Sequence, residues 1–241
     1  MIITGRKPVL EALRYDASIS RIYLQYGIHG EIIEQIKILA KQKNISITET
    51  SPSKLIELSE GKDSQGVAAL RSELSFFSLE EILSDVNNIS NPVLLLLDMI
   101  QDPHNLGAIL RTAEAAGVNG VLVTKHNSAP LNQTVVKTSA GAIEHLKISM
   151  IDNVVNTLKE LKEHGFWIVG STLDGAKDHS LIDFNMPVVL IVGNEEKGIR
   201  HLTARNCDFL VKIPMAGKIN SLNVSVATGI LLFEILRQKK M

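Results

Sequence analysis

Two short runs of consecutive apolar residues constrain the fold of this chain more than any other feature. Residues 93–97 read VLLLL and residues 188–192 read VVLIV, and polar residues follow both runs closely. Such runs are typical of strands buried on both faces of a parallel sheet, because a half-exposed strand alternates apolar and polar side chains. Helical patterns alternate with these and further strands, one of them expected at residues 146–148. This alternation predicts an α/β fold with a mainly parallel, doubly wound sheet.

A polar segment divides the chain of 241 residues into two parts. Residues 1–71 read as a small α/β unit, in which strand patterns alternate with an amphipathic helix at residues 31–43. Residues 72–91 are rich in Ser, Glu and Asn, and we interpret them as a linker that contains one short helix at residues 79–86. Residues 92–241 then form the second domain, which contains the expected parallel sheet.

Composition excludes several kinds of site. The single cysteine, Cys207, cannot form an internal disulfide, and the seven histidines show no metal-ligand spacing. A net charge of −1 is not that of a strongly basic nucleic-acid binder, although a local basic patch is compatible with it. There is no signal-peptide pattern and no apolar run of about 18 residues that would span a bilayer. We therefore expect a cytoplasmic protein with no metal and no membrane partner.

Polar clusters follow three of the expected strands. The first cluster is DPHNLG at residues 102–107, the second is GNEEKG at residues 193–198, and the third lies within residues 213–223. Ligands of open parallel sheets bind beyond the carboxyl ends of the strands. The three clusters can therefore contribute to one ligand site.

The same residues also have plainer interpretations. Asp102 or Asn105 can cap the helix after the first cluster, which would leave Arg111 in solvent. Ser221 or Asn223 can cap the helix near the end of the chain. Alternatively, Asn105 and Arg111 offer an amide and a guanidinium to a phosphate, a sugar hydroxyl or a carboxylate. The chain lacks the dinucleotide fingerprint, the P-loop, the nucleophile elbow and the zinc-protease motif, which disfavours those enzyme classes.

Taken in order, the three clusters carry a resemblance to a known family. The stretches DPHNLGAILRTAEAAG, VVLIVGNEEKGI and IPMAGKINSLNVSVATG resemble the three motifs of the SpoU (TrmH-type) 2′-O-ribose RNA methyltransferases. The resemblance covers about residues 92–240, and the N-terminal part is similar to the small RNA-binding domain of some members. Length and domain pairing are most similar to the RlmB type, which methylates a guanosine ribose in 23S rRNA.

The resemblance implies a SPOUT-type parallel sheet with a deep C-terminal trefoil knot, preceded by a small α/β RNA-binding domain. It implies a homodimer that uses S-adenosylmethionine as methyl donor, without a metal. The implied cofactor-binding residues are Thr172, Gly193, Ile213 and Leu222. The implied catalytic residues are Asn105, Arg111, Glu195, Ser221 and Asn223.

The expected roles of these residues follow from their chemistry within the family picture. The family assigns proton removal to the position of Arg111, but arginine stays protonated at any ordinary pH. We therefore expect Arg111 to bind a phosphate and to stabilise the forming alkoxide. Asn105 would orient Arg111 or the RNA. Ser221 and Asn223 would shape the cofactor loop, which Glu195 would fix through backbone N–H groups.

RNA, either 23S rRNA or its precursor, is the partner that the resemblance implies. Candidate phosphate contacts in the N-terminal domain are Arg6, Lys7, Arg14 and Arg21, and the alternative interpretation of these charges is a solvated face. Within the same chemistry, tRNA or another rRNA nucleoside is an alternative substrate. From another class, the chain could be a non-catalytic RNA-binding or ribosome-assembly factor on the same scaffold.

Overall fold

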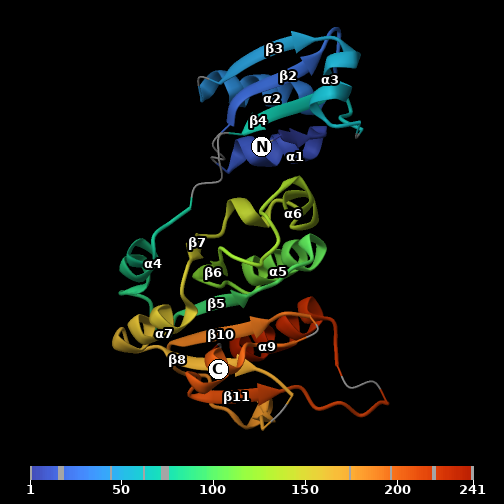
Figure 1. Cartoon of the computed structure of the whole chain (residues 1–241). Coiled ribbons are helices and arrows are strands. Elements are labelled where there is room, and N and C mark those ends of the chain that lie inside the picture. The colour runs from blue at the N-terminus through green and yellow to red at the C-terminus, as the bar shows by residue number, and fades with distance from the viewer. Residues whose placement is uncertain are drawn as a thin grey trace. The chain divides into compact units, whose positions relative to one another are not determined.

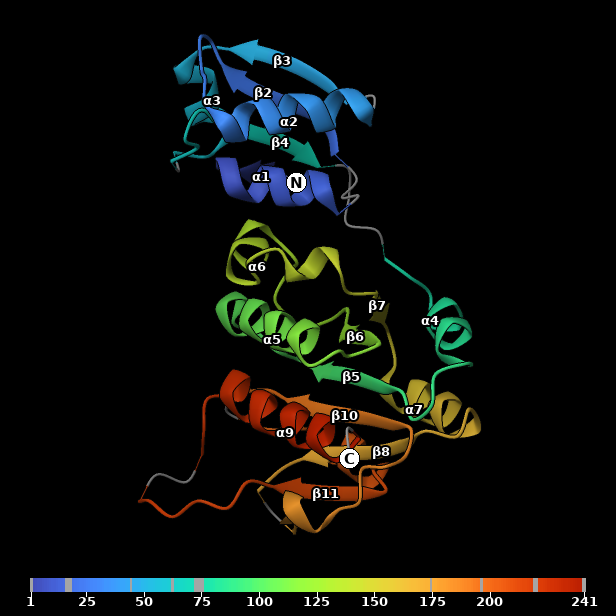
Figure 2. The same cartoon turned by 180° about the vertical axis from the view of Figure 1, so that it is seen from behind.

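The computed structural model describes residues 2–15, 19–43, 45–61, 63–71, 76–173, 175–195, 197–218 and 221–239. The chain forms two compact units, shown from opposite sides in Figures 1 and 2. The first unit comprises Met1–Ser75 and Leu131–His145, and the second comprises Phe76–Pro130 and Leu146–Met241. Within the described ranges, no helix combines the length and apolar character needed to cross a membrane.

The first unit is built on a four-stranded sheet in the order β1-β4-β2-β3. Its elements are β1 (Ile2–Thr4), α1 (Arg6–Arg14), β2 (Ile19–Gln25), α2 (Glu31–Gln42), β3 (Ser46–Thr50), α3 (Pro52–Leu58), β4 (Val67–Arg71), α6 (Gln133–Thr138) and the 3-10 helix η1 (Ala142–Glu144). β2 is parallel to β3 and antiparallel to β4. The helical spacing of Ile33, Ile36 and Ala40 turns one face of α2 toward the core that it shares with α1 and the sheet.

The second unit is built on a seven-stranded sheet in the order β7-β6-β5-β10-β8-β11-β9, in which every pairing is parallel. Its elements are α4 (Leu79–Val86), β5 (Val93–Asp98), α5 (Pro103–Ala115), β6 (Gly120–Thr124), β7 (Ile148–Ile151), α7 (Val154–Glu163), β8 (Trp167–Ser171), β9 (Lys177–Asp178), η2 (His179–Leu181), β10 (Val188–Gly193), α8 (His201–Arg205), β11 (Phe209–Lys212) and α9 (Val224–Lys239). The predicted parallel α/β fold is confirmed.

The two apolar runs of the sequence become the neighbouring strands β5 and β10. They pair in register from Val93 beside Val188 to Asp98 beside Gly193. Leu94 and Leu96 belong to the core beneath α4 and α7. The opposite face is covered by α5 and α9, which pack against each other (Figure 2). Burial on both faces explains why these strands are uniformly apolar.

Some elements differ from the sequence-based expectation. The strand expected at residues 146–148 is β7, which spans Ile148–Ile151 because it pairs with Val121–Thr124 of β6. The segment interpreted as a linker contains α4, which is the short helix expected there and begins with a Ser78–Glu81 capping box, but this helix does more than connect two domains. The buried residues of α4 are part of the core of the second unit. The trefoil knot stays a prediction.

Candidate active site

The carboxyl ends of neighbouring strands bring most of the predicted cofactor-binding residues together. β10, β8 and β11 are consecutive in the sheet, and Gly193, Thr172 and Ile213 end or directly follow them. Because the strands are parallel, these positions lie along one edge of the sheet. The fourth residue, Leu222, lies two residues before α9 and is exposed.

Three of the five predicted catalytic residues form one hydrogen-bonded chain. Asn223 Nδ2 donates to Asn105 Oδ1 at 2.9 Å, and Asn105 Nδ2 donates to Glu195 Oε1 at 3.1 Å. The same Glu195 oxygen accepts the backbone N–H of Asp102 at 3.4 Å. Asn223 Oδ1 accepts the backbone N–H of Ser225 at 2.9 Å, so Asn223 also caps α9. The chain joins the loops after β5 and β10 to the start of α9.

These contacts were not among the expected ones. One amide hydrogen and the amide oxygen of Asn105 bind protein groups, so Asn105 bridges two loops, and its role in orienting Arg111 or the RNA stays a prediction. Asp102 is the residue that caps α5, because its Oδ1 accepts the His104 N–H at 2.8 Å. Glu195 holds the loop after β5, and its role at the cofactor loop stays a prediction. The sequence showed which residues were polar but not which of them would pair.

Arg111 lies on α5, six residues beyond Asn105, and its side chain is exposed. No residue in the described part of the chain forms a hydrogen bond or ion pair with its guanidinium. A guanidinium without a protein partner can take a phosphate or carboxylate in a two-point contact. Ser221 is exposed two residues before Asn223, and no described contact joins it to the hydrogen-bonded chain.

The loop after β10 is folded tightly back on the strand end. Gly198 N donates to Asn194 O at 2.9 Å, and Lys197 N donates to Asn194 Oδ1 at 3.2 Å. A Cβ atom on Gly193 would lie only 2.2 Å from the carbonyl carbon of Gly198. Glycine at position 193 therefore permits the close approach that forms the turn, and the turn carries Glu195.

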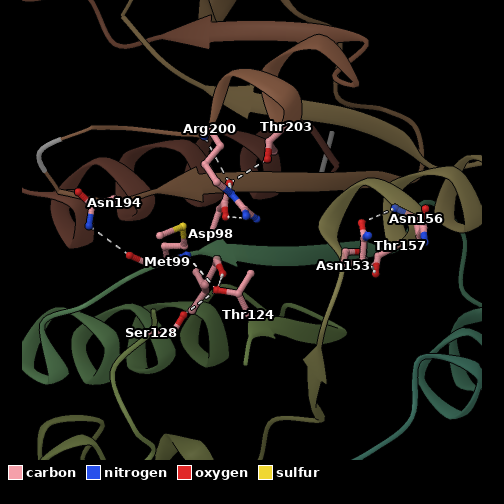
Figure 3. A network of polar contacts seen from close by, with 11 residues as sticks. Asp98, Met99, Thr124, Ser128, Asn153, Asn156, Thr157, Asn194, Arg200 and Thr203 are labelled. Atoms are coloured by element: carbon pink, nitrogen blue, oxygen red, sulfur yellow. Dashed lines mark hydrogen bonds and ion pairs between the residues drawn. The ribbon is translucent and has the colours of Figure 1, made fainter. Parts of the chain in front are cut away.

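A second group of polar residues, to which the sequence assigned no role, lies at the same edge (Figure 3). The Asp98 carboxylate at the end of β5 is fully buried, and its Oδ1 lies 2.8 Å from Arg200 Nη2. Asp98 Oδ2 accepts a hydrogen bond from Thr203 Oγ1 at 2.9 Å. In the sequence, the signal for this group is Asp98, an acidic residue that directly follows the apolar run at residues 93–97.

The residue after Asp98 adopts an unusual backbone conformation. Met99 has a φ of 64°, in the left-handed region that glycine favours. Its N–H donates to Thr124 Oγ1 at 3.0 Å, and its carbonyl accepts Asn194 Nδ2 at 3.2 Å. The side chains of Thr124 and Asn194, which lie at the ends of β6 and β10, thus bind the N–H and the carbonyl of Met99.

Cys207 is predicted to be unreactive in the folded protein. Burial raises the pKa of its thiol to about 12, and its Sγ lies against Gly170, where an added Cβ would come within 2.7 Å of the sulfur. Because the thiolate is the reactive form, iodoacetamide should modify the native protein slowly and the urea-unfolded protein fully. Mass spectrometry over time would measure both rates, and equal rates would contradict the prediction.

The same thiol should make stability depend on pH in the alkaline range. Its pKa is higher in the folded protein than the ordinary value of 9.0, so the folded state holds the proton more tightly. This contribution to stability is complete below that value and decreases as the pH rises toward about 12. Urea unfolding at several pH values would reveal a decrease that a Cys207→Ala variant lacks.

Two protein-family models match the chain. The SpoU rRNA Methylase family matches residues 92–233, and RNA 2'-O ribose methyltransferase substrate binding matches residues 2–77. A Staphylococcus haemolyticus protein named as a TrmH family tRNA/rRNA methyltransferase is 39% identical, covering 99% of this chain and 96% of that protein. A Bacillus subtilis protein with the same family name is 37% identical, covering 98% of this chain and 95% of that protein.

Solved structures agree with these matches. The AdoMet-bound rRNA methyltransferase from Sinorhizobium meliloti is 27% identical with a TM-score of 0.84, covering 98% of this chain and 86% of that one. The SpoU methyltransferase AviRb from Streptomyces viridochromogenes, in complex with AdoMet, shares the fold at a TM-score of 0.86 and 24% identity, covering 100% of this chain and 90% of that one. The predicted family and fold class are thereby confirmed: the chain belongs to the SpoU rRNA methylase family and is an RNA methyltransferase.

Proposed function

We propose that this enzyme transfers a methyl group from S-adenosylmethionine to the ribose 2′-hydroxyl of a guanosine in 23S rRNA. The observation that carries the proposal is the hydrogen-bonded chain of Asn105, Glu195 and Asn223. Asn105 lies on α5, which also carries Arg111, and no described residue pairs with the Arg111 guanidinium. The choice of 23S rRNA rests on the resemblance to the RlmB type. Transfer RNA is a second candidate, because the named relatives carry both substrates in their names. An rRNA substrate agrees with the predicted cytoplasmic location.

The residues at the strand edge fit S-adenosylmethionine as the methyl donor. We assign its binding to Thr172, Gly193, Ile213 and Leu222, of which three end or follow adjacent strands. The exposed side chains of Met215 and Leu222 offer apolar surface of the kind that packs against an adenine ring. Backbone groups at the strand ends can hydrogen bond the polar parts of the molecule. When bound, the donor supplies an electrophilic methyl group, and neutral S-adenosylhomocysteine remains after transfer.

The protein's own residues have positioning and electrostatic tasks in this reaction. Arg111 binds the phosphate beside the target ribose and stabilises the negative charge that develops on the 2′-oxygen. The proton passes to phosphate or water, because arginine does not act as a base. The hydrogen bonds of Asn105 with Glu195 and Asn223 hold α5 and the neighbouring loops at fixed positions relative to one another. Correct alignment of the two reactants is worth about 7–11 kcal/mol of the barrier. A role for Ser221 in shaping the cofactor loop stays a prediction.

Mapping of ribose methylation across total RNA tests the proposal. RNA from cells with and without this gene would be compared by alkaline cleavage, which a 2′-O-methyl group blocks. One guanosine of 23S rRNA should be protected only when the gene is present. A mark confined to tRNA would support the second candidate. RNA binding without methyl transfer from labelled donor would instead indicate the non-catalytic assembly factor, and a methylated base would contradict the proposed chemistry.

The four candidate phosphate-binding residues of the first unit have different surroundings. Arg6 Nε donates to the Gln65 carbonyl at 3.1 Å, and Arg14 pairs with Glu11 at 3.2 Å. Lys7 and Arg21 are exposed, and no described residue pairs with either. We propose that Lys7 and Arg21 contact RNA phosphates, since their charges are not offset locally.

Removal of a phosphate contact should reduce the salt dependence of RNA binding. Each of Lys7→Gln and Arg21→Gln is expected to lower the slope of log affinity against log salt by about 0.7–0.9. Arg14→Gln is the matched control, because its charge is already paired with Glu11. Filter binding at several salt concentrations measures the slope. Equal slopes for all variants and the wild type would assign these residues to a solvated face.

We also propose that the enzyme is a homodimer that uses an exposed stripe of α9. Val226, Ile230 and Phe233 recur every three or four residues and are 50%, 37% and 49% exposed, so they share one helix face. A second copy of the chain would cover this stripe. Sedimentation velocity should show a dimer for the wild type and a monomer for Phe233→Asp. Leu202→Asp, at an exposed leucine of α8, is the control that should stay dimeric.

A further inference from the structure

A buried carboxylate connects the strand that precedes Asn105 to the loop that carries Glu195 (Figure 3). Asp98 is the last residue of β5, and Arg200 directly precedes α8. Arg200 contacts both carboxylate oxygens, through Nη2 at 2.8 Å from Oδ1 and through Nε, which donates to Oδ2 at 3.2 Å. Thr203 Oγ1 donates to Oδ2 as well, at 2.9 Å. The Asp98 side chain is fully buried, whereas that of Arg200 is half-exposed.

A second contact lies at the opposite end of the same loop. Asn194 Nδ2 donates to the carbonyl of Met99, the residue that follows Asp98, at 3.2 Å. Asn194 directly precedes Glu195. The loop after β10 is thus tied to the end of β5 both at Asn194, where it begins, and at Arg200, where it ends. Glu195 lies between these two attachments and reaches across to Asn105.

We propose that Asp98 is a positioning residue for methyl transfer, acting through Arg200 and the loop after β10 on the contact between Glu195 and Asn105. The inference rests on the proposed function, because it assigns Asp98 to the geometry of that active site. A buried carboxylate that loses its cation is left uncompensated, so the loop cannot leave β5 without a large electrostatic cost. The ion pair of Asp98 with Arg200 therefore keeps Glu195 within reach of Asn105. Because Asn105 lies on α5, the ion pair also helps to fix the position of that helix, which carries Arg111.

The test is a double-mutant cycle on the turnover number. Asp98→Asn should fold, because the half-exposed Arg200 stays solvated when its partner becomes neutral. It should lower kcat for RNA methylation by about 30-fold while KM for RNA changes by less than about twofold. In the Glu195→Ala variant, adding Asp98→Asn should lower kcat by less than about threefold, because the contact between Glu195 and Asn105 is already absent. If the fold-losses of kcat in the two single variants multiply in the double variant, the two residues act independently and the proposal is overturned.

Asp208 provides a matched control at the opposite edge of the sheet. Its Oδ1 accepts Lys162 Nζ at 2.6 Å, and its Oδ2 accepts the Ile168 N–H at 2.8 Å near the start of β8. Asp208→Asn removes a carboxylate that also binds a cation and a backbone N–H, although its side chain is 24% exposed, and no described contact connects it to the loop after β10. This variant should lower Tm without changing kcat by more than about twofold at a temperature where it is folded. An equal loss of kcat in both variants would assign Asp98 to general stability.

Hydrogen exchange gives a measurement that needs neither RNA nor activity. The Gly198 and Arg200 amides are hydrogen bonded, to Asn194 O and Asp98 Oδ2 respectively. In Asp98→Asn they should exchange at least about tenfold faster, and in Asp208→Asn they should be unchanged. If Asp98→Asn does not fold, Arg200→Lys keeps a cation without the two-point contact and should show the same changes. Unaltered exchange would overturn the proposal, whereas a wild type that methylates no RNA would refute the proposed function alone.

Discussion

Replacing Arg111 with lysine is expected to reduce methyl transfer to RNA by about 100-fold or more. Lysine keeps the positive charge but loses the planar fork that contacts a phosphate at two points. The substitution should leave the fold intact, because no described residue depends on Arg111 for a hydrogen bond or ion pair. S-adenosylmethionine binding should also be unchanged, since Arg111 is not among the residues assigned to the donor.

Transfer of a labelled methyl group measures this effect, and calorimetry with the donor alone separates chemistry from cofactor binding. Arg205→Lys is the matched control, because Arg205 is an exposed arginine on α8 and is not part of the proposed site. Arg205→Lys should keep wild-type turnover. Full turnover of Arg111→Lys would show that a two-point contact is not needed and would remove the assigned role.

Gly193→Ala is expected to have the second large effect, a loss of S-adenosylmethionine affinity of at least about 100-fold. The added Cβ would lie 2.2 Å from the Gly198 carbonyl carbon and 2.3 Å from both the Gly198 oxygen and the Ile199 nitrogen. All of these are backbone atoms, so no side-chain rotation relieves the clash, and the loop after β10 must move. We expect a stability loss of about 3 kcal/mol or more, at the upper end of overpacking effects.

Gly229→Ala is the control for this substitution, because Gly229 lies on α9 and is not among the residues assigned to the donor. A Cβ at position 229 would come no closer than 3.5 Å to its nearest neighbour, Thr112 Cγ2, which is an ordinary van der Waals contact. Calorimetry should give a wild-type donor affinity for Gly229→Ala and none measurable for Gly193→Ala, and urea unfolding should show a loss of stability only for Gly193→Ala. A Gly193→Ala variant with normal affinity would show that the loop can shift without harming the site.

The sequence was sufficient to predict the sheet and the edge where the site lies. The apolar runs at residues 93–97 and 188–192 can be satisfied only by burial on both faces, which fixes them as interior parallel strands. Once they are parallel, the polar residues after each strand must lie at one edge. The polar clusters that contain Asn105, Glu195 and Asn223 were placed in this way, whereas the family resemblance implied their catalytic role. The hydrogen bonds among these residues agree with a shared site.

The sequence was not sufficient to predict which polar groups pair. Asp98 and Arg200 are 102 residues apart, and only the pairing of β5 with β10 places them together. Asn105 was expected to orient Arg111 or the RNA, and its hydrogen bonds to Glu195 and Asn223 were not foreseen, because local spacing says nothing about partners from other loops. The helix α4 was missed as part of the core because its polar flanks resemble a linker, whereas its buried Ile82 and Leu83 are decided by tertiary packing.

The contact between Asn105 and Asn223 has a consequence for the time at which activity appears during synthesis. These residues are 118 positions apart, and Asn223 lies at the start of the last helix. A ribosome-bound nascent chain that has not yet released α9 can pair its early strands but cannot close the link. Contacts between such distant residues also form slowly. Each new molecule should therefore be catalytically silent until α9 has left the ribosome, and the late folding of this helix should set the delay before the first turnover.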